Sequence, residues 1–172
     1  MSLEIVDAQT AEQLDAVRAL CWEYREFLIA LGPAEAKVVS VYYPKPVYEK
    51  VLSQLEEDYA PPQGATLLVT FDGKPVGCGM FHTFAPGIAE IKRVYLKEDI
   101  RGMGAGRRLM EAIIARIQAA DFEMIYMDTG KPLIAARALY AKLGFRERGP
   151  YAETPPEAED IIVYFDMDLR KT

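Results

Sequence analysis

The segment Arg101-Gly102-Met103-Gly104-Ala105-Gly106 stands between two stretches of different hydrophobic periodicity. Residues 89–96 before it alternate and are rich in branched and aromatic side chains, which predicts a β-strand. The apolar residues after it follow helical spacing: Leu109, Met110, Ile113, Ile114 and Ile117. Glycines let backbone N–H groups approach a ligand closely, and a helix N-terminus favours anions. The segment therefore predicts an anion-binding turn between a strand and a helix.

The charges around this turn are unusual for the start of a helix. Arg101, Arg107 and Arg108 cluster where acidic side chains are ordinarily favoured, and the first acid is Glu111. A bound anion would account for positive side chains at a helix start, where negative ones are ordinarily favoured. The alternative is that exposed arginines at a helix start cost only about 0.3–1 kcal/mol each and need no ligand. The G-x-G-x-G spacing differs from the G-x-G-x-x-G of a dinucleotide-binding turn, which counts against a Rossmann site.

The elements expected upstream of the turn are a strand at 3–8, a helix up to Gly32, a loop at 33–46 and a shorter helix at 47–55. The long helix should begin after Thr10, because Thr10 and Gln13 form a capping box. Asp72-Gly73 tolerates the positive φ of a tight turn and predicts a hairpin. The hairpin strands should cover 65–71 and 74–84.

Downstream of the turn, the expected elements are a strand at 123–128, a helix at 133–143, and two closing strands at 145–149 and 161–169. Gly144 should end the helix. A polar, proline-rich loop is expected at 150–160. The chain has no internal repeat and no long linker, so a single domain over residues 1–172 is expected.

Composition excludes several classes of protein. A net charge of -6 argues against broad binding to nucleic acid or to a membrane surface. Cys21 and Cys78 have no C-x-x-C spacing and are expected to be reduced, buried hydrophobes. The N-terminus does not resemble a signal peptide, so a cytoplasmic location is expected. His82 is the only histidine, and no serine lies in a G-x-S-x-G elbow, which disfavours metal sites and serine hydrolase chemistry.

Two motifs at the appropriate separation resemble the GNAT superfamily of acetyl-CoA-dependent N-acetyltransferases. The first is R/Q-x-x-G-x-G/A, matched by Arg101, Gly104 and Gly106. The second is A-x-x-L-Y-x-x-x-G-F, whose matching residues are Ala136, Leu139, Tyr140, Gly144 and Phe145. The resemblance covers nearly the whole chain. It implies an α/β (α+β) fold with a mixed, mostly antiparallel sheet of about seven strands flanked by about four helices.

The resemblance also implies a site for acetyl-CoA, with no metal. The pyrophosphate would lie on the N–H groups of residues 102–107, and the pantetheine arm along the edge of the strand that precedes them. The implied cofactor-binding residues are Val94, Tyr95, Leu96, Arg101, Gly102, Met103, Gly104, Ala105, Gly106, Arg107, Thr129 and Arg137. Relatives often carry an Asn near residues 132–134, which here are Pro-Leu-Ile.

Acetyl transfer to an amine requires a group that takes a proton. An amine of pKa near 10.4 loses its proton at pH 7.4 at a cost of about 4 kcal/mol. Glu90 matches the position of a catalytic carboxylate in some branches and is the candidate base. The alternative is that Glu90 pairs with Lys92, and His82 is a second candidate base. Tyr140 matches the family's general acid; otherwise it is a packing residue.

The main hypothesis is therefore an N-acetyltransferase in which an amine, of a small molecule or a peptide, attacks acetyl-CoA directly. A backbone N–H near Leu96 would hold the oxyanion, as the resemblance implies. The resemblance also implies that the acceptor approaches over a set of aromatic residues, whose alternative role is packing in the core: Trp22, Tyr42, Tyr43, Tyr48, Tyr59 and Tyr151. The alternatives are a non-catalytic acyl-CoA-binding sensor, and a phosphate or nucleotide binder that shares only the turn. Relatives often dimerise, so a homodimer is a further expectation.

Overall fold

A computed structural model describes residues 2–171, in which one seven-stranded sheet has the order β1-β2-β3-β4-β5-β7-β6. The strands are β1 (Leu3–Asp7), β2 (Ala65–Phe71), β3 (Lys74–Ala85), β4 (Ile88–Leu96), β5 (Met124–Gly130), β6 (Arg146–Arg148) and β7 (Ile162–Asp168). Every neighbouring pair is antiparallel except β4 and β5. The predicted mixed, mostly antiparallel sheet of seven strands is confirmed.

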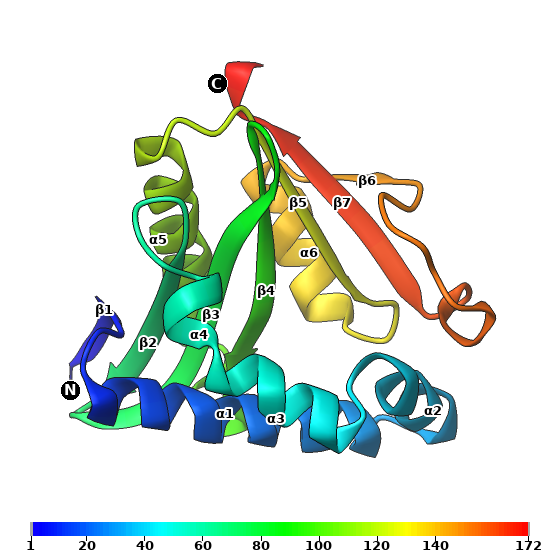
Figure 1. Ribbon diagram of the computed structural model, residues 1–172, viewed down its shortest axis with the longest axis horizontal. Coiled ribbons are helices and arrows are strands. Elements are labelled where there is room, and N and C mark those ends of the chain that lie inside the picture. Colours follow the sequence, from blue (N-terminus) through cyan, green and yellow to red (C-terminus); the bar gives the residue numbers. More distant parts are fainter. Residues whose placement is uncertain (1, 172) are drawn as a thin grey trace.

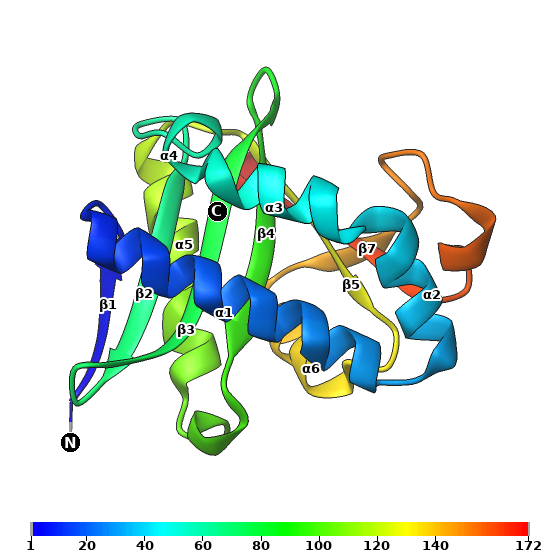
Figure 2. The same cartoon turned by 60° about the horizontal axis from the view of Figure 1, so that its bottom comes forward.

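Helices cover both faces of the sheet. They are α1 (Ala11–Ala30), α2 (Pro33–Tyr42), α3 (Lys45–Ser53), α4 (Leu55–Asp58), α5 (Ala105–Ala119) and α6 (Ile134–Leu143). Figure 2 shows α1 and α3 crossing one face, with α5 and α6 behind the other. α2 reaches the loop between β6 and β7, where it contacts the 3-10 turn Pro156–Ala158. None of the helices in residues 2–171 is long and apolar enough to span a bilayer.

The local signals that predicted the first helix and the hairpin are confirmed. The Thr10 hydroxyl accepts a hydrogen bond from the Gln13 N–H at 3.1 Å, while the Gln13 side chain accepts one from the Thr10 N–H at 3.1 Å. Asp72 and Gly73 both have positive φ, at 48° and 79°, as a tight hairpin turn requires. The order of strands and helices also agrees with the prediction, except for two additional helices.

The prediction of a loop at 33–46 is wrong, because Pro33–Tyr42 forms α2. Pro33 lies in the first turn of that helix, where its missing N–H would have no helical partner in any case. Pro44 and Pro46 likewise stand at the start of α3 rather than inside a loop. Within residues 2–171 the sheet therefore carries six α-helices instead of about four, the additional ones being α2 and the single turn α4.

Two hydrophobic cores lie on the two faces. The core under α5 and α6 contains Leu109, Ile113 and Phe165, whereas the core under α1, α3 and α4 contains Leu20 and Leu52. The second core also holds Cys21 and Cys78, both free and fully buried, as expected for structural thiols. Residues of one strand that face the first core alternate with residues that face the α1 side.

The parallel pairing between β4 and β5 is short. It runs over four residue pairs, from Ile88–Met124 to Ile91–Met127, and then stops although both strands continue. Figure 1 shows the two strands side by side at one end and apart at the other. We call the space between their separated ends the strand gap. At the same level β4 carries a bulge, because Gly79 of β3 lies opposite both Arg93 and Val94.

Replacing Thr10 by Ala removes the cap of α1, and we expect the free energy of unfolding to fall by about 1 kcal/mol. Urea titration followed by circular dichroism measures this loss. Thr10→Ser keeps the hydroxyl and should retain most of the stability. Equal stability of the Ala and Ser variants would show that the capping box contributes nothing to the fold.

Candidate active site

The edge of β4 that faces the strand gap offers backbone groups. The Tyr95 carbonyl points toward β3, close to Gly77, so the neighbouring residues Val94 and Leu96 direct their backbone groups toward the gap. The Arg101 guanidinium donates to the Leu96 carbonyl at 3.2 and 3.1 Å. Of the three predicted pantetheine residues, Val94 and Leu96 therefore line the gap with their backbone, whereas Tyr95 pairs with β3.

The turn before α5 is an open cradle of backbone amides. Gly102 and Gly104 have φ values of 81° and 76°, a left-handed conformation that favours glycine, and the space beside both is empty. Gly104 is the N-cap of α5 and supplies no side-chain cap, and the first turn holds no acid. The N–H groups of Ala105 and of the residues after it thus remain available to an anion.

The three arginines near the cradle are held by the protein itself. Arg101 binds the Leu96 carbonyl and lies 4.8 Å over the ring of Phe27. Arg107 forms an ion pair with Glu111 at 2.8 Å, and Arg108 donates to the carbonyl of Leu3 at 3.1 Å. Their clustering therefore has structural causes, and the case for an anion site rests on the amides and not on the charges.

Thr129 and Arg137 stand on the α6 side of the gap. Thr129 is buried on β5, on the same face as Met127. Arg137 donates to the Lys131 carbonyl at 3.1 Å and to Glu147 at 3.0 Å, but its buried Nε has no partner in residues 2–171. An orphaned donor at this position is compatible with a further ligand on this side of the gap.

Tyr140 lies on α6, and its side chain packs against Phe145 and Phe165 at ring-centroid distances of 6.1 and 5.8 Å. Its hydroxyl makes no hydrogen bond within residues 2–171 and is not among the fully enclosed polar atoms. Burial and then the charge of Asp128 raise the pKa of Tyr140 above its ordinary value. Tyr140 therefore presents a protonated phenol, as a general acid must.

Glu90 is enclosed by partners. His82 Nε2 lies 2.8 Å from its Oε1, the Tyr151 hydroxyl donates to its Oε2 at 2.7 Å, and Lys92 Nζ is 4.0 Å from the same oxygen. Its side chain is only 10% exposed. Burial opposes ionisation, but His82, Lys92 and Tyr151 outweigh burial and lower the pKa of Glu90. The predicted pairing with Lys92 exists, yet two closer partners occupy the carboxylate.

Asp128 is a second carboxylate that the sequence analysis missed. Its Oδ2 lies 3.4 Å from the Tyr151 hydroxyl and 4.0 Å from Lys92 Nζ. The side chain is 34% exposed, and burial followed by the charge of Glu90 raises its pKa. Aspartate is disfavoured in strands, so its occurrence in the apolar segment that forms β5 was a signal that could have identified it. We call the surroundings of Asp128, Lys92 and Tyr151 the acceptor recess.

The predicted acceptor aromatics divide into two groups. Tyr48 and Tyr59 are buried, and with Tyr43 they surround the guanidinium of Arg93 at 5.8 to 5.9 Å. Trp22 packs edge-on against Tyr48 at 5.0 Å. Tyr151 instead belongs to the acceptor recess, together with Tyr42, which lies beside Tyr164. The structure therefore brings Tyr42 and Tyr151 to the carboxylates and leaves most of the others in packing roles.

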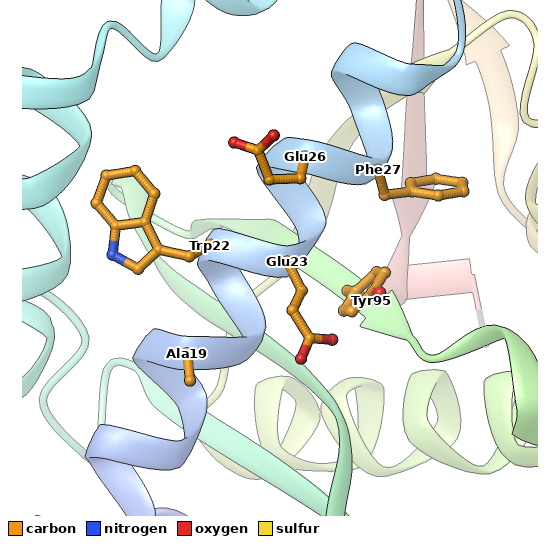
Figure 3. A pocket seen from close by; sticks show the side chains of 6 residues that line it. All are labelled: Ala19, Trp22, Glu23, Glu26, Phe27 and Tyr95. Carbon is orange, nitrogen blue, oxygen red and sulfur yellow. The ribbon is translucent and has the colours of Figure 1, made fainter.

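A further hollow of about 500 Å³ lies along α1, outside the strand gap. Figure 3 shows its lining, which is Ala19, Trp22, Glu23, Glu26, Phe27 and Tyr95. Glu23 is paired with Lys97 at 3.3 Å. Tyr140, Glu90 and Asp128 are not among the residues that line this hollow. In the part of the chain that the structure describes, no three His, Cys, Asp or Glu side chains are grouped to hold a metal ion.

Comparison with known proteins agrees with this geometry. The sequence model of the "Acetyltransferase (GNAT) family" matches residues 18–145. The chain belongs to the GNAT acetyltransferase family. A Schizosaccharomyces pombe protein described as an uncharacterized N-acetyltransferase is 31% identical over 115 residues, which are 66% of this chain and 69% of that protein. The IAA acetyltransferase of Azospirillum brasilense is 34% identical over 105 residues, 60% of this chain and 69% of the relative.

Solved GNAT structures share the fold at low sequence identity. A Staphylococcus aureus Mu50 acetyltransferase superposes with a TM-score of 0.74 at 16% identity, covering 98% of this chain and 99% of that one. The PaiA N-acetyltransferase of Thermoplasma acidophilum, solved in complex with coenzyme A, superposes with a TM-score of 0.69 at 17% identity over 98% and 99%. The resemblance to the GNAT superfamily that the motifs indicated is thereby confirmed, and the chain is an acyltransferase of a family that uses acetyl-CoA.

The residues present fit acetyl-CoA. The open amide cradle at the start of α5 suits a pyrophosphate, and the backbone of Val94 and Leu96 suits an extended amide-bearing chain. The side chain of Tyr140 lies in the core under α5 and α6.

Gly104→Glu should abolish acetyl-CoA binding, because a side chain and a negative charge would enter the cradle. We expect the affinity measured by titration calorimetry to fall at least tenfold, which is about 1.4 kcal/mol. Gly73→Glu is the matched control, because Gly73 has a similar φ of 79° and equally open surroundings in the β2–β3 turn. Unchanged affinity in the Gly104 variant, or an equal loss in both variants, would place the pyrophosphate elsewhere.

Proposed function

We propose that the chain transfers an acetyl group from acetyl-CoA to an amine by direct attack within the strand gap. The proposal is supported by the open amide cradle before α5, by the edge of β4 that leaves the β5 ladder after Ile91, and by the phenol of Tyr140 and the carboxylate of Asp128, whose charge raises the pKa of that phenol. One group can give a proton to a leaving thiolate and the other can take one from an ammonium. Cys21 and Cys78 are buried in the core under α1 and are not placed to act as nucleophiles.

Binding of the acyl donor rests on backbone groups. The N–H groups of residues 102–107 would hold the pyrophosphate, and Val94 and Leu96 would pair with the pantetheine arm as a neighbouring strand does. Acetyl-CoA supplies the thioester that the amine attacks. The carbonyl of that thioester would accept a hydrogen bond from a backbone N–H near Leu96, which stabilises the developing oxyanion.

The carboxylates would remove the proton of the acceptor. Keeping an amine of pKa near 10.4 unprotonated at pH 7.4 costs about 4 kcal/mol, so a nearby base favours attack. Glu90 has both oxygens engaged and acts as base only through a neighbouring group. Asp128 is open to the acceptor recess and has a raised pKa, and it therefore meets the ammonium first.

The side chains around Asp128 indicate the chemical class of the acceptor. Two carboxylates favour a cationic primary amine, and the rings of Phe84, Tyr126 and Tyr164 around Tyr151 favour an apolar or aromatic body. Lys92 lies 4.0 Å from both carboxylates, and its charge favours the ionised form of each against the effect of burial.

Tyr140→Phe should lower kcat by about 10²-fold while leaving acetyl-CoA affinity unchanged, because only the proton donor is lost. Thiol release during acetylation of a primary amine measures the rate. Tyr48→Phe is the control: it removes a buried hydroxyl that donates to the Cys21 carbonyl, so it lowers stability and leaves the rate of the folded protein intact. Full activity of the Tyr140→Phe variant would show that Tyr140 is not the general acid.

Asp128→Asn should slow acetylation and change its pH dependence. Because the pKa of Asp128 is raised, the wild-type rate should fall as pH decreases through that value, which lies above the ordinary 3.8. The variant has no carboxyl group at position 128, so its residual rate should not fall with decreasing pH in that range. The exposed Asp58 provides a control through Asp58→Asn. An unchanged pH–rate profile in the Asp128 variant would contradict its role.

A further inference from the structure

Arg93 is a buried arginine that has no carboxylate partner among residues 2–171. It is 8% exposed, and the other buried arginine of the described chain, Arg25, is 7% exposed. Arg25 donates from Nε to the Tyr43 carbonyl at 2.9 Å and lies 3.5 Å from the carboxylate of Glu26. The side chains around Arg93 are instead tyrosines and a cysteine. Since buried charges in proteins are ordinarily paired, the lack of a partner calls for a cause.

One whole edge of the Arg93 guanidinium is unused. Nη1 donates to the Tyr59 hydroxyl at 2.8 Å and lies 3.7 Å from the sulfur of Met80. Nε is enclosed and has no hydrogen-bond partner within residues 2–171. Nη2 has no partner there either, but it is not among the fully enclosed atoms. Nε and Nη2 form one side of the planar group, and two such parallel donors match the two oxygens of a carboxylate.

The same edge holds a carboxylate at two other arginines of this chain. Arg116 donates from Nε and Nη2 to the two oxygens of Asp7, at 2.8 and 3.3 Å. Arg170 donates from the same two atoms to the oxygens of Asp168, at 3.0 and 3.1 Å. Arg93 has this pair of donors and no carboxylate on it. The pattern therefore points to a carboxylate that a ligand supplies.

The aromatic rings around Arg93 do not replace that carboxylate. The guanidinium lies 5.9, 5.8 and 5.9 Å from the ring centroids of Tyr43, Tyr48 and Tyr59. Attraction to aromatic rings offsets part of the cost of a buried charge, but it leaves the N–H groups of Nε and Nη2 without acceptors. The Tyr59 hydroxyl accepts from Arg93, and its own proton has no acceptor within residues 2–171. That hydroxyl is a further donor for an anion.

Arg93 borders the acceptor recess. Lys92 precedes it on β4, and the bulge places both side chains on the same face of the sheet. Lys92 Nζ lies 4.0 Å from the carboxylate of Asp128. Tyr43, whose ring lies over Arg93, is also the strongest electrostatic neighbour of Lys92. One acceptor molecule can therefore place its amine near Asp128 and a second group near Arg93.

We propose that Arg93 binds a carboxylate of the acceptor, an inference that rests on the proposed function and narrows its substrate class. The acceptor is then an amine that also carries a carboxylate, as an amino acid does. Its carboxylate approaches Arg93 from the side of Nη2, the donor that is not enclosed, and the Tyr59 hydroxyl gives a further hydrogen bond. Binding of this group supplies the partner that the buried guanidinium lacks.

The test uses two pairs of acceptor probes that differ only by a carboxylate: phenylalanine with 2-phenylethylamine, and 6-aminohexanoate with pentylamine. Thiol release from acetyl-CoA gives kcat/KM for each probe. Arg93→Met should lower the ratio of acid to amine at least tenfold in at least one pair, with kcat/KM for the carboxylate-free amine nearly unchanged. Comparing ratios between proteins cancels the different basicities of the amines. Arg25→Lys is the control, because this equally buried arginine has its own partners and should leave the ratio unchanged.

A second measurement uses the unaltered protein and needs no turnover, so it holds even where Arg93→Met does not fold. Addition of 3-phenylpropanoate, a carboxylate without an amine, should shift the Nε–H signal of Arg93 in NMR spectra of protein with isotope-labelled arginine. Arg93→Lys, which keeps the charge, assigns that signal by its absence.

Equal loss with both members of each pair in Arg93→Met, or no shift of the Arg93 signal, would overturn the inference and leave Arg93 a structural role. Equal ratios in the unaltered protein and in Arg93→Met would also overturn it while leaving amine acetylation intact. Failure of the unaltered protein to acetylate any of the four probes would overturn the proposed function, and the acceptor role of Arg93 with it.

Discussion

The early end of the pairing between β4 and β5 is the constraint on which the rest of the site depends. Backbone N–H and C=O groups that leave a ladder must find other partners, and an unpaired group inside a protein costs about 1–3 kcal/mol. Arg101 satisfies the carbonyl of Leu96, and the β4–β5 ladder does not extend past Ile91. The proposed binding of the pantetheine arm depends on this unpaired edge.

The bulge at Arg93 accounts for the concentration of charge beside that opening. One extra residue in β4 places the side chains of Lys92 and Arg93 on the same face of the sheet, where regular alternation would separate them. Arg93 has a φ of 53°, and its buried Nε has no partner in residues 2–171. Buried charges and left-handed backbone destabilise a domain. The aromatic rings of Tyr43, Tyr48 and Tyr59 around the guanidinium of Arg93 offset part of this cost.

Much of the fold could be predicted from local signals in the sequence. The capping box at Thr10, the Asp72-Gly73 turn and the glycines at 102–106 each act within a few residues, so they fix element boundaries wherever the chain folds. The prolines at 33–46 led to the wrong prediction of a loop, because a proline can begin a helix as well as end one. The cradle was found from its glycines, whereas the arginines around it turned out to bind protein groups.

Apart from Lys92, two residues along β4, the groups around Glu90 could not be found in this way. The register of β3, β4 and β5 brings His82 and Asp128 to the same region, and the β6–β7 loop supplies Tyr151. Glu90 was predicted as the candidate base from the position of a catalytic carboxylate in some branches of the family, but its burial and its engaged oxygens are tertiary properties. Asp128 can be recognised as a candidate base only from the structure, which places the end of β5 next to Lys92.

The most direct measurement of the central claim is an amide NMR titration of the labelled protein with coenzyme A. If the strand gap and the cradle hold the acyl donor, the signals of Val94, Leu96 and residues 102–107 should shift most, together with those around Tyr140 on α6. Shifts confined to the hollow around Trp22 and Phe27, or no shifts at millimolar coenzyme A, would contradict the account.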